Sequence, residues 1–285
     1  GKLSKSLIVI NDVDEDLEGE ASAWRRSAMK STAGAGVDQT IVEGTKTETI
    51  GRLMYIGNND VVVEGMTLRT AKLDGSWSGR SGSGIMSVSQ NLILRDVKVE
   101  DVVGAGYKDD KPGTVVNLTN GPSLVQRVEV TNSDSGTGNV MSVDGGGGSR
   151  VFVDRVNIHD VSMRQKEPRG ALSAQNATVF GSVVARGAGA GVLEDSYYVN
   201  CTVAGHLNYA FYKGGHWGSY YVLNSVVADN EKLPYETGDG ALHFMHNVIN
   251  QPGFAFVSGQ LVDGFGGAGQ DGTNQQPTVD PNFVG

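Results

Sequence analysis

Residues 84–101 read GIMSVSQNLILRDVKVED, and this stretch predicts the architecture of the whole chain. It contains three short apolar segments, at 85–88, 92–94 and 97–99, separated by polar corners. Short strands rich in Val, Ile and Leu that alternate with Asn, Asp, Ser and Gly are typical of one coil of a β-solenoid. The same pattern recurs along most of the sequence.

The segment that ends each coil defines the repeat. In eight segments, from VEGMTL at 63–68 to MHNVIN at 245–250, an apolar residue is followed by two small or polar residues and then a second, usually apolar one. These second residues are Met66, Val97, Val128, Val156, Val183, Thr202, Val226 and Val248. Their mean separation of 26 residues, with a local alternation of two, predicts about eight coils of β-strand with insertions confined to loops.

The first strands of the coils predict an inward and an outward row. They align as LMYI, IMSV, VVNL, VMSV, ALSA, VLED and AFYK, with ALHF at 241–244 as a poor eighth member. Alternation places the second residue inside, which gives Met54, Met86, Val116, Met141, Leu172, Leu193 and Phe211. The third residue then faces outward, which gives Tyr55, Ser87, Asn117, Ser142, Ser173, Glu194, Tyr212 and His243.

The chain is therefore expected to be an all-β protein with one domain. Residues 1–40 form an N-terminal cap, with a first strand at 6–10 and a short amphipathic helix at 14–30 that covers the open end. Residues 41–250 form the coils, and the Gly-rich residues 251–285 end the solenoid. Long loops after the third strands, such as 102–113 and 160–170, are expected to wall the outward row.

Composition limits the partners. The net charge of −9 argues against nucleic acid, and no apolar run approaches the length of a membrane span. The only cysteine, Cys201, excludes an internal disulfide. It occupies the corner position of Ser182 and Ser225 in neighbouring coils, so a packed, unreactive thiol is expected.

The N-terminal region offers one arrangement of oxygen ligands. Asp12, Asp14, Asp16 and Glu18 stand at alternate positions, as calcium ligands do. Leu17, however, stands where a calcium-binding loop has glycine. We therefore favour a solvated acidic cap over a calcium site, and no cofactor is expected.

The coil pattern over residues 41–250 resembles the right-handed parallel β-helix of the pectate-lyase-like superfamily. The phrases LNSVVADN, VNCTVAG and VDPNFVG are similar to repeats of secreted and surface β-helix proteins of bacteria, including polymorphic outer-membrane proteins. The resemblance implies an extracellular or cell-surface location. In such proteins the DP-x-FV phrase is followed by more β-helix or by an anchor, so a trimmed domain is implied here.

The sixth and seventh coils contain the residues best suited to chemistry. Glu194 and Asp195 are aligned with Tyr212 and Lys213, and aromatic and histidine side chains stand in adjacent loops, namely Tyr209, His216 and Trp217.

A lyase needs a base and a cation that neutralises a uronate carboxylate. Lys213 is the candidate base, Tyr212 or His216 the candidate acid, and Arg164, Lys166 or Arg169 the candidate cation. Glu194, Asp195, Tyr209, Trp217 and Arg164 are candidates for binding the substrate. An Asp195–Lys213 pair that merely closes an irregular coil is the structural alternative.

Three functional hypotheses follow. The first is a secreted or surface β-helix with a structural or adhesive role and a face that binds a polysaccharide or surface glycan. It is favoured because the motifs of known β-helix enzymes are not found. The second is a polysaccharide lyase or glycoside hydrolase acting in a groove on coils 5–8. The third is a subunit that oligomerises by stacking end to end. His159, His243 and His246 are expected to be ordinary surface or corner histidines.

Overall fold

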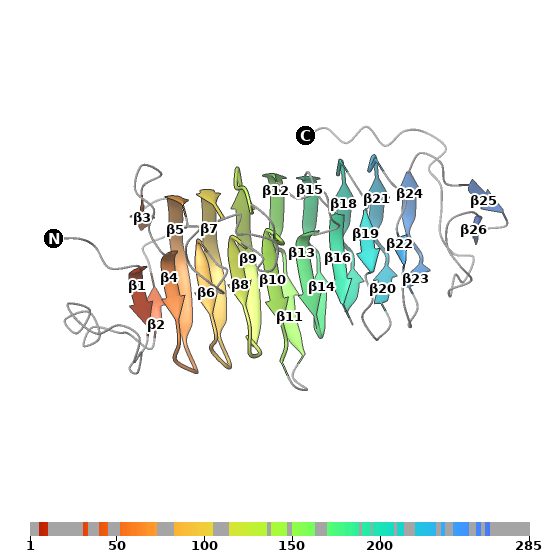
Figure 1. The fold of residues 1–285 in the computed structure, drawn as a ribbon. Coiled ribbons are helices and arrows are strands. Elements are labelled where there is room, and N and C mark those ends of the chain that lie inside the picture. Colours follow the sequence, from red (N-terminus) through yellow and green to blue (C-terminus); the bar gives the residue numbers. More distant parts are fainter. Residues whose placement is uncertain are drawn as a thin grey trace.

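The chain folds as a parallel β-solenoid, as the computed structural model in Figure 1 shows. The structure describes residues 6–10, 31–33, 40–44, 52–72, 83–104, 114–135, 138–146, 150–162, 170–187, 190–194, 196–207, 210–213, 220–231, 235–236, 242–250, 255–257 and 260–262. No α-helix occurs among them. The helix expected at 14–30 and the acidic residues considered for calcium lie outside these ranges.

Two parallel sheets build the solenoid. The first has nine strands in the order β1 (Ser6–Ile10), β4 (Arg52–Ile56), β6 (Ile85–Ser87), β8 (Val116–Leu118), β10 (Met141–Asp144), β13 (Gly170–Gln175), β16 (Ala190–Glu194), β19 (Phe211–Lys213) and β22 (Tyr235–Glu236). Each neighbour in this order comes from the next turn of the chain, so the sheet runs along the length of the solenoid (Figure 1).

The second sheet has fifteen strands and two ladders. Its long strands β5 (Val62–Lys72), β7 (Ile93–Val103) and β9 (Leu124–Thr131) run through both ladders. One ladder starts at β2 (Ser31–Ala33) and continues beyond β9 with β11 (Val151–Asp154), β14 (Ala177–Phe180), β17 (Tyr197–Val199), β20 (Tyr220–Leu223) and β23 (Leu242–Met245). The other starts at β3 (Ile41–Glu43) and continues with β12 (Asn157–Val161), β15 (Val183–Gly187), β18 (Thr202–Ala204), β21 (Val226–Ala228) and β24 (Val248–Asn250). A separate hairpin pairs β25 (Ala255–Val257) with β26 (Gln260–Val262).

The structure describes about five turns of the solenoid with side chains, against the eight coils expected. The turns that begin with β4, β6, β8, β10 and β13 have described side chains on both sheets. Further strands continue both sheets at either end, but segments outside the described residues interrupt those turns.

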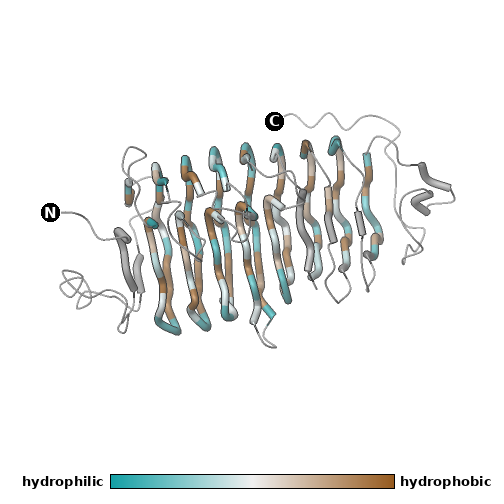
Figure 2. The backbone as a smooth tube through the Cα atoms, in the orientation of Figure 1, coloured by the Kyte–Doolittle hydropathy of each residue, from teal (hydrophilic) through white to brown (hydrophobic). Residues whose placement is uncertain are grey.

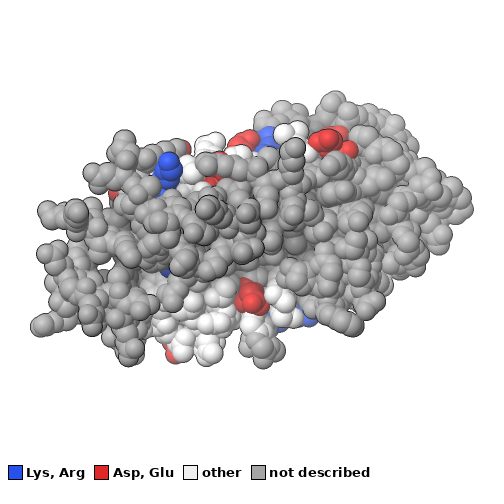
Figure 3. Space-filling view, in the orientation of Figure 1, with Lys and Arg blue, Asp and Glu red and all other residues white. Residues whose placement is uncertain are grey.

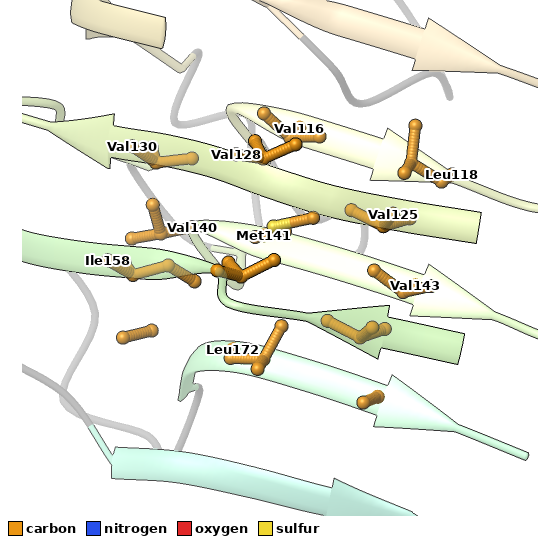
Figure 4. Close-up of a cluster of buried hydrophobic side chains, with 14 of the residues drawn as sticks. Val116, Leu118, Val125, Val128, Val130, Val140, Met141, Val143, Ile158 and Leu172 are labelled. Atoms are coloured by element: carbon orange, nitrogen blue, oxygen red, sulfur yellow. The ribbon is translucent and has the colours of Figure 1, made fainter. Parts of the chain in front are cut away.

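The core is a column of aliphatic side chains enclosed by the two sheets. Val116, Met141 and Leu172 from the first sheet face Val128 and Ile158 from the second, and each is at most 1% exposed (Figure 4). Apolar and polar residues alternate along the strands, as Figure 2 shows. Because each turn buries a layer of Val, Leu, Ile and Met against the next, the core needs few aromatic residues.

Side chains of the first sheet alternate between inward and outward, as expected. In the turn that contains β6, however, the inward residue is one position earlier than we expected. The inward row comprises Met54, Ile85, Val116, Met141 and Leu172. Met86, which we expected in this row, instead pairs with Tyr55 and Asn117. Ser87, expected outside, is fully buried and accepts a hydrogen bond from the Ser89 amide. Ile85 and Met86 are both apolar and adjacent, so the sequence pattern does not show which of the two points inward.

The corner between the two ladders of the second sheet requires a similar correction. Register places Ser182, rather than Val183, above Val156, because Asn157 pairs with Val183. The inward row thus changes from apolar to polar residues, in the order Met66, Val97, Val128, Val156, Ser182, Cys201, Ser225 and Asn247. The Val156 amide donates to Ser182 Oγ and the Cys201 amide donates to Ser225 Oγ, so these buried side chains accept hydrogen bonds from backbone donors of the preceding turn.

Each turn bends at residues with positive φ. The corner between the two ladders has one such residue per turn: Gly65, Asp96, Arg127, Arg155, Gly181, Asn200, Asn224 and His246. The corner after the second ladder has Thr70, Asp101, Asn132, Asp160, Arg186, Gly205 and Asp229. The left-handed conformation costs about 1–2 kcal/mol for a residue other than glycine. Its recurrence at the same places shows that stacking of the turns imposes it.

Ion pairs between successive turns reinforce this register. The residues of each pair stand at the same place in adjacent turns: Glu43–Arg69, Glu64–Arg95, Asp96–Arg127 and Asp160–Arg186. Arg127 binds both carboxylate oxygens of Asp96, at 2.5 and 2.6 Å, and Arg186 binds both of Asp160, at 2.7 and 2.9 Å. A guanidinium fork gives such pairs a fixed geometry, so they favour the observed register over a slipped one.

Met141→Ala tests the core. We expect it to lower the free energy of unfolding by about 2–5 kcal/mol, because it leaves a cavity between the sheets. The neighbouring Ser142→Ala, at a partly exposed outward position, should change it by less than about 0.5 kcal/mol. Urea titration followed by circular dichroism measures both, and equal effects of the two substitutions would contradict the assigned phase.

Asp160 gives stability a pH dependence. Hydrogen bonds from Arg186, and then from His159, lower the pKa of Asp160 from 3.8 to about 2. Because the pKa is depressed in the folded state, the contribution is fully present above pH 4 and is lost as the pH falls towards 2. The difference in melting temperature between the parent protein and Asp160→Asn should therefore shrink over that range. Asn132→Ala, at the same corner position, is the control and should show no such change, because neither side chain is ionisable.

Candidate functional site

The structure describes only part of the site predicted from the sequence. Glu194 lies in β16, and Tyr212 and Lys213 lie in β19, where the backbone positions are given. The other predicted residues lie outside the described part of the chain: Asp195, Tyr209, His216, Trp217, Arg164, Lys166 and Arg169.

Strand register separates two residues that we expected to be aligned. Tyr212 pairs with Val192, whereas Glu194 pairs with Gln175. The expected alignment of Glu194 with Tyr212 is therefore wrong by two residues. Val192 also pairs with Ser173 of the preceding turn, so the expected alignment of β16 is two residues out against both of its neighbours. An error of two residues keeps each side chain on the same face of the sheet, so the alternation of apolar and polar residues does not reveal it. Lys213 pairs with Glu236 of the next turn.

A different group of side chains forms a continuous outward face on the second sheet. The face occupies six strands of the first ladder, β9, β11, β14, β17, β20 and β23. Its first row comprises Leu124, Phe152, Thr178, Tyr197, Tyr221 and His243. Its second row comprises Gln126, Asp154, Phe180, Val199, Leu223 and Met245. We call these twelve residues the aromatic face. All of them except Asp154 are partly or well exposed.

Three rings of the first row stack along the solenoid axis. The centroids of Tyr197 and Tyr221 lie 4.7 Å apart with an interplanar angle of 8°, and those of Tyr221 and His243 lie 4.6 Å apart at 10°. The Arg150 guanidinium covers the other side of Tyr197, 4.8 Å from its centroid, and donates a hydrogen bond to the Ala177 carbonyl. Both faces of Tyr197 and of Tyr221 are thus covered. The exposed parts of these tyrosines are therefore their ring edges rather than their ring faces.

The two phenylalanines of the face are its most exposed aromatic residues. Phe152 is 44% exposed and Phe180 is 38% exposed, and their rings are offset, with centroids 6.5 Å apart. At this separation neither ring covers the other fully, so ring surface remains available for a ligand.

Asp154 provides a fixed polar group beside the phenylalanines. Gln126 Nε2 and two nitrogens of Arg155 all donate to Asp154 Oδ2, at 2.7 to 3.0 Å. The hydrogen bonds from Arg155, more than that from Gln126, lower the pKa of Asp154, so it is ionised at neutral pH. The aromatic face thus combines exposed rings with the partly exposed Gln126 amide, which the buried Asp154 carboxylate of the next turn holds in place.

The charged side chains are otherwise dispersed. On the face drawn in Figure 3, the described Lys, Arg, Asp and Glu residues of both signs are scattered singly. Figure 3 therefore offers no broad basic or acidic patch among the residues it colours as described.

The histidines occupy different environments. His159, on the second ladder, has Nδ1 2.7 Å from Asp160 and Nε2 3.2 Å from Glu129 of the preceding turn. His246 is an exposed corner residue with positive φ. Both agree with the expectation of surface or corner histidines, whereas His243 belongs to the stacked row rather than to the first sheet.

Neither a metal-binding group nor a membrane-spanning helix occurs among the described residues. They contain no group of three or more His, Cys, Asp or Glu residues suited to a metal ion. Nor, within those same residues, is any helix long and apolar enough to cross a bilayer.

Comparison with known proteins gave no match to a family model, to a curated protein or to a solved structure.

The structure confirms that Cys201 is buried at the corner position shared with Ser182 and Ser225. Its Sγ lies 3.3 Å from the Val199 carbonyl. Burial raises the pKa of the thiol to about 11. The thiolate is the reactive form, so this cysteine is unsuited to nucleophilic chemistry at neutral pH.

We expect an aromatic disulfide reagent at pH 8 to leave Cys201 unlabelled in the folded protein. In concentrated guanidinium chloride the same thiol should react stoichiometrically, because unfolding removes the burial. Labelling of the folded protein at the rate of a free cysteine would contradict the assigned packing.

Proposed function

We propose that the chain is a secreted or cell-surface β-helix protein of the pectate-lyase-like type, with a structural or adhesive role, that binds a polysaccharide or surface glycan on the aromatic face. The exposure of Phe152 and Phe180 near the partly exposed Gln126 amide carries this proposal. Sugar rings have an apolar side that stacks on aromatic rings and hydroxyl groups that bind carboxylates and amides. This face offers both kinds of partner.

The chemistry of the face favours binding over catalysis. The Asp154 carboxylate is held in its ionised form by Arg155, which suits a hydrogen-bond acceptor rather than a proton donor. A lyase or hydrolase that uses Lys213, Tyr212, His216 and Arg169 stays an alternative, as does end-to-end assembly. Polysaccharide screening for unsaturated uronates and new reducing ends tests the first alternative, and size-exclusion chromatography at several concentrations tests the second.

Phe152→Ala and Phe180→Ala test the proposed binding. On an immobilised panel of neutral and acidic polysaccharides, each substitution should weaken binding about tenfold, because a stacked aromatic contact contributes about 0.5–1.5 kcal/mol beyond burial. The control is Val183→Ala, which removes a side chain with the same 38% exposure from β15, on the other ladder. The glycan-binding proposal fails if the phenylalanine variants bind as well as the parent protein, or if Val183→Ala weakens binding equally.

A further inference from the structure

The aromatic face is long and narrow. Its six strands are separated by five steps of about 4.8 Å, so it extends about 24 Å along the solenoid axis. Its two rows are two residues apart along each strand, which is about 7 Å. The face is therefore more than three times as long as it is wide.

These dimensions argue against a second copy of the chain as the occupant. A strip of this size presents a few hundred Å² at most, whereas a stable protein–protein interface needs about 800 Å² from each partner. An occupant that fits a narrow strip is a single extended polymer.

The hydrogen bonds of the ladder argue against a peptide. A peptide that binds to a sheet adds a strand at its edge, where backbone donors and acceptors are unpaired. The strands beneath the aromatic face pair on both sides, as β17 does with β14 and β20. A peptide lying across this face would find side chains alone, and its own backbone groups would be without partners.

The distribution of groups along the strip matches a repeating ligand. Phe152 and Phe180 offer ring surface near one end, and Tyr197 and Tyr221 offer ring edges and hydroxyl groups farther along. Thr178 lies between Phe152 and Tyr197 in the same row. Groups that bind a sugar unit thus recur along the axis, rather than surrounding a single pocket.

We propose that the ligand is a long, unbranched polysaccharide that lies parallel to the solenoid axis across β11, β14, β17 and β20, rather than a terminal mono- or disaccharide. This inference rests on the proposed function. Its consequence is that affinity rises with chain length until the oligosaccharide spans the strip and then stays constant.

The experiment is a length series measured by isothermal titration calorimetry. Oligosaccharides from disaccharide to octasaccharide, prepared from whichever polysaccharide of the panel binds, are titrated into the full chain. We expect the dissociation constant to fall at least about tenfold between the shortest and the longest members. Equal affinity for all members of the series would overturn the inference that a long polysaccharide lies along the solenoid axis. It would not contradict the proposal that this face binds a glycan.

Variants at the two ends of the strip add a positional test. Tyr221→Ala should weaken binding of long chains and leave the shortest chains unaffected, whereas Phe152→Ala should weaken binding of both. If Tyr221→Ala does not fold, Tyr221→Phe replaces it in the test, because this variant keeps the stacked ring. Tyr221→Phe should reduce the affinity for long chains alone, because one hydroxyl contact is lost. An effect of Tyr221 substitution that is the same at every length would contradict the proposed path. If Phe152→Ala binds every member as the parent does, glycan binding by this face fails altogether.

Discussion

The hydrogen bonds between turns govern this structure. Each internal strand of the two sheets pairs in parallel with the strand one turn earlier and the strand one turn later, so a residue is held above its counterpart at about 4.8 Å. At this spacing the side chains of neighbouring residues in a row touch, so they must be mutually compatible. Aliphatic residues fill the interior rows, and ion pairs and stacked rings occupy the exterior ones.

The same constraint explains how the aromatic face arises. Tyr197 and Tyr221 come from successive turns of the chain, and register brings their rings to a stacking distance. Parallel stacking of turns converts one suitable residue per turn into a continuous surface. Such a surface can bind a polymer without a deep cleft or a catalytic cluster, because each turn would contact one part of the polymer in a similar way.

The sequence predicted the fold class well, because three short strands and two polar corners in each coil produce a pattern with a fixed local alternation. Phase was harder to predict. At Ile85 and Met86, two adjacent apolar residues fit either face, and at Ser182 a polar residue occupies an inward position because its hydroxyl binds the backbone. Alignment on apolar residues therefore slipped by one position at each place.

The candidate site was not predicted, for a related reason. Phe152, Tyr197, Tyr221 and His243 each stand three residues before the corner residue with positive φ, as Arg155, Asn200, Asn224 and His246 show. Alignment on those corners would have revealed the row, but corner residues vary in type between Arg, Gly, Asn and His. The offset between Glu194 and Tyr212 was missed because a slip of two residues preserves the alternation of inward and outward side chains.

The recurring left-handed corners also bear on how such a chain can change in length. A duplication that spans one corner to the equivalent corner of the next turn would add a complete layer, with its backbone donors, its core residue and its exterior residue already in place. A single-residue insertion within a strand would instead reverse which side chains point inward. Growth by whole layers would extend the aromatic face in steps of one strand spacing, so a longer outer surface and a longer core would be gained by the same genetic event.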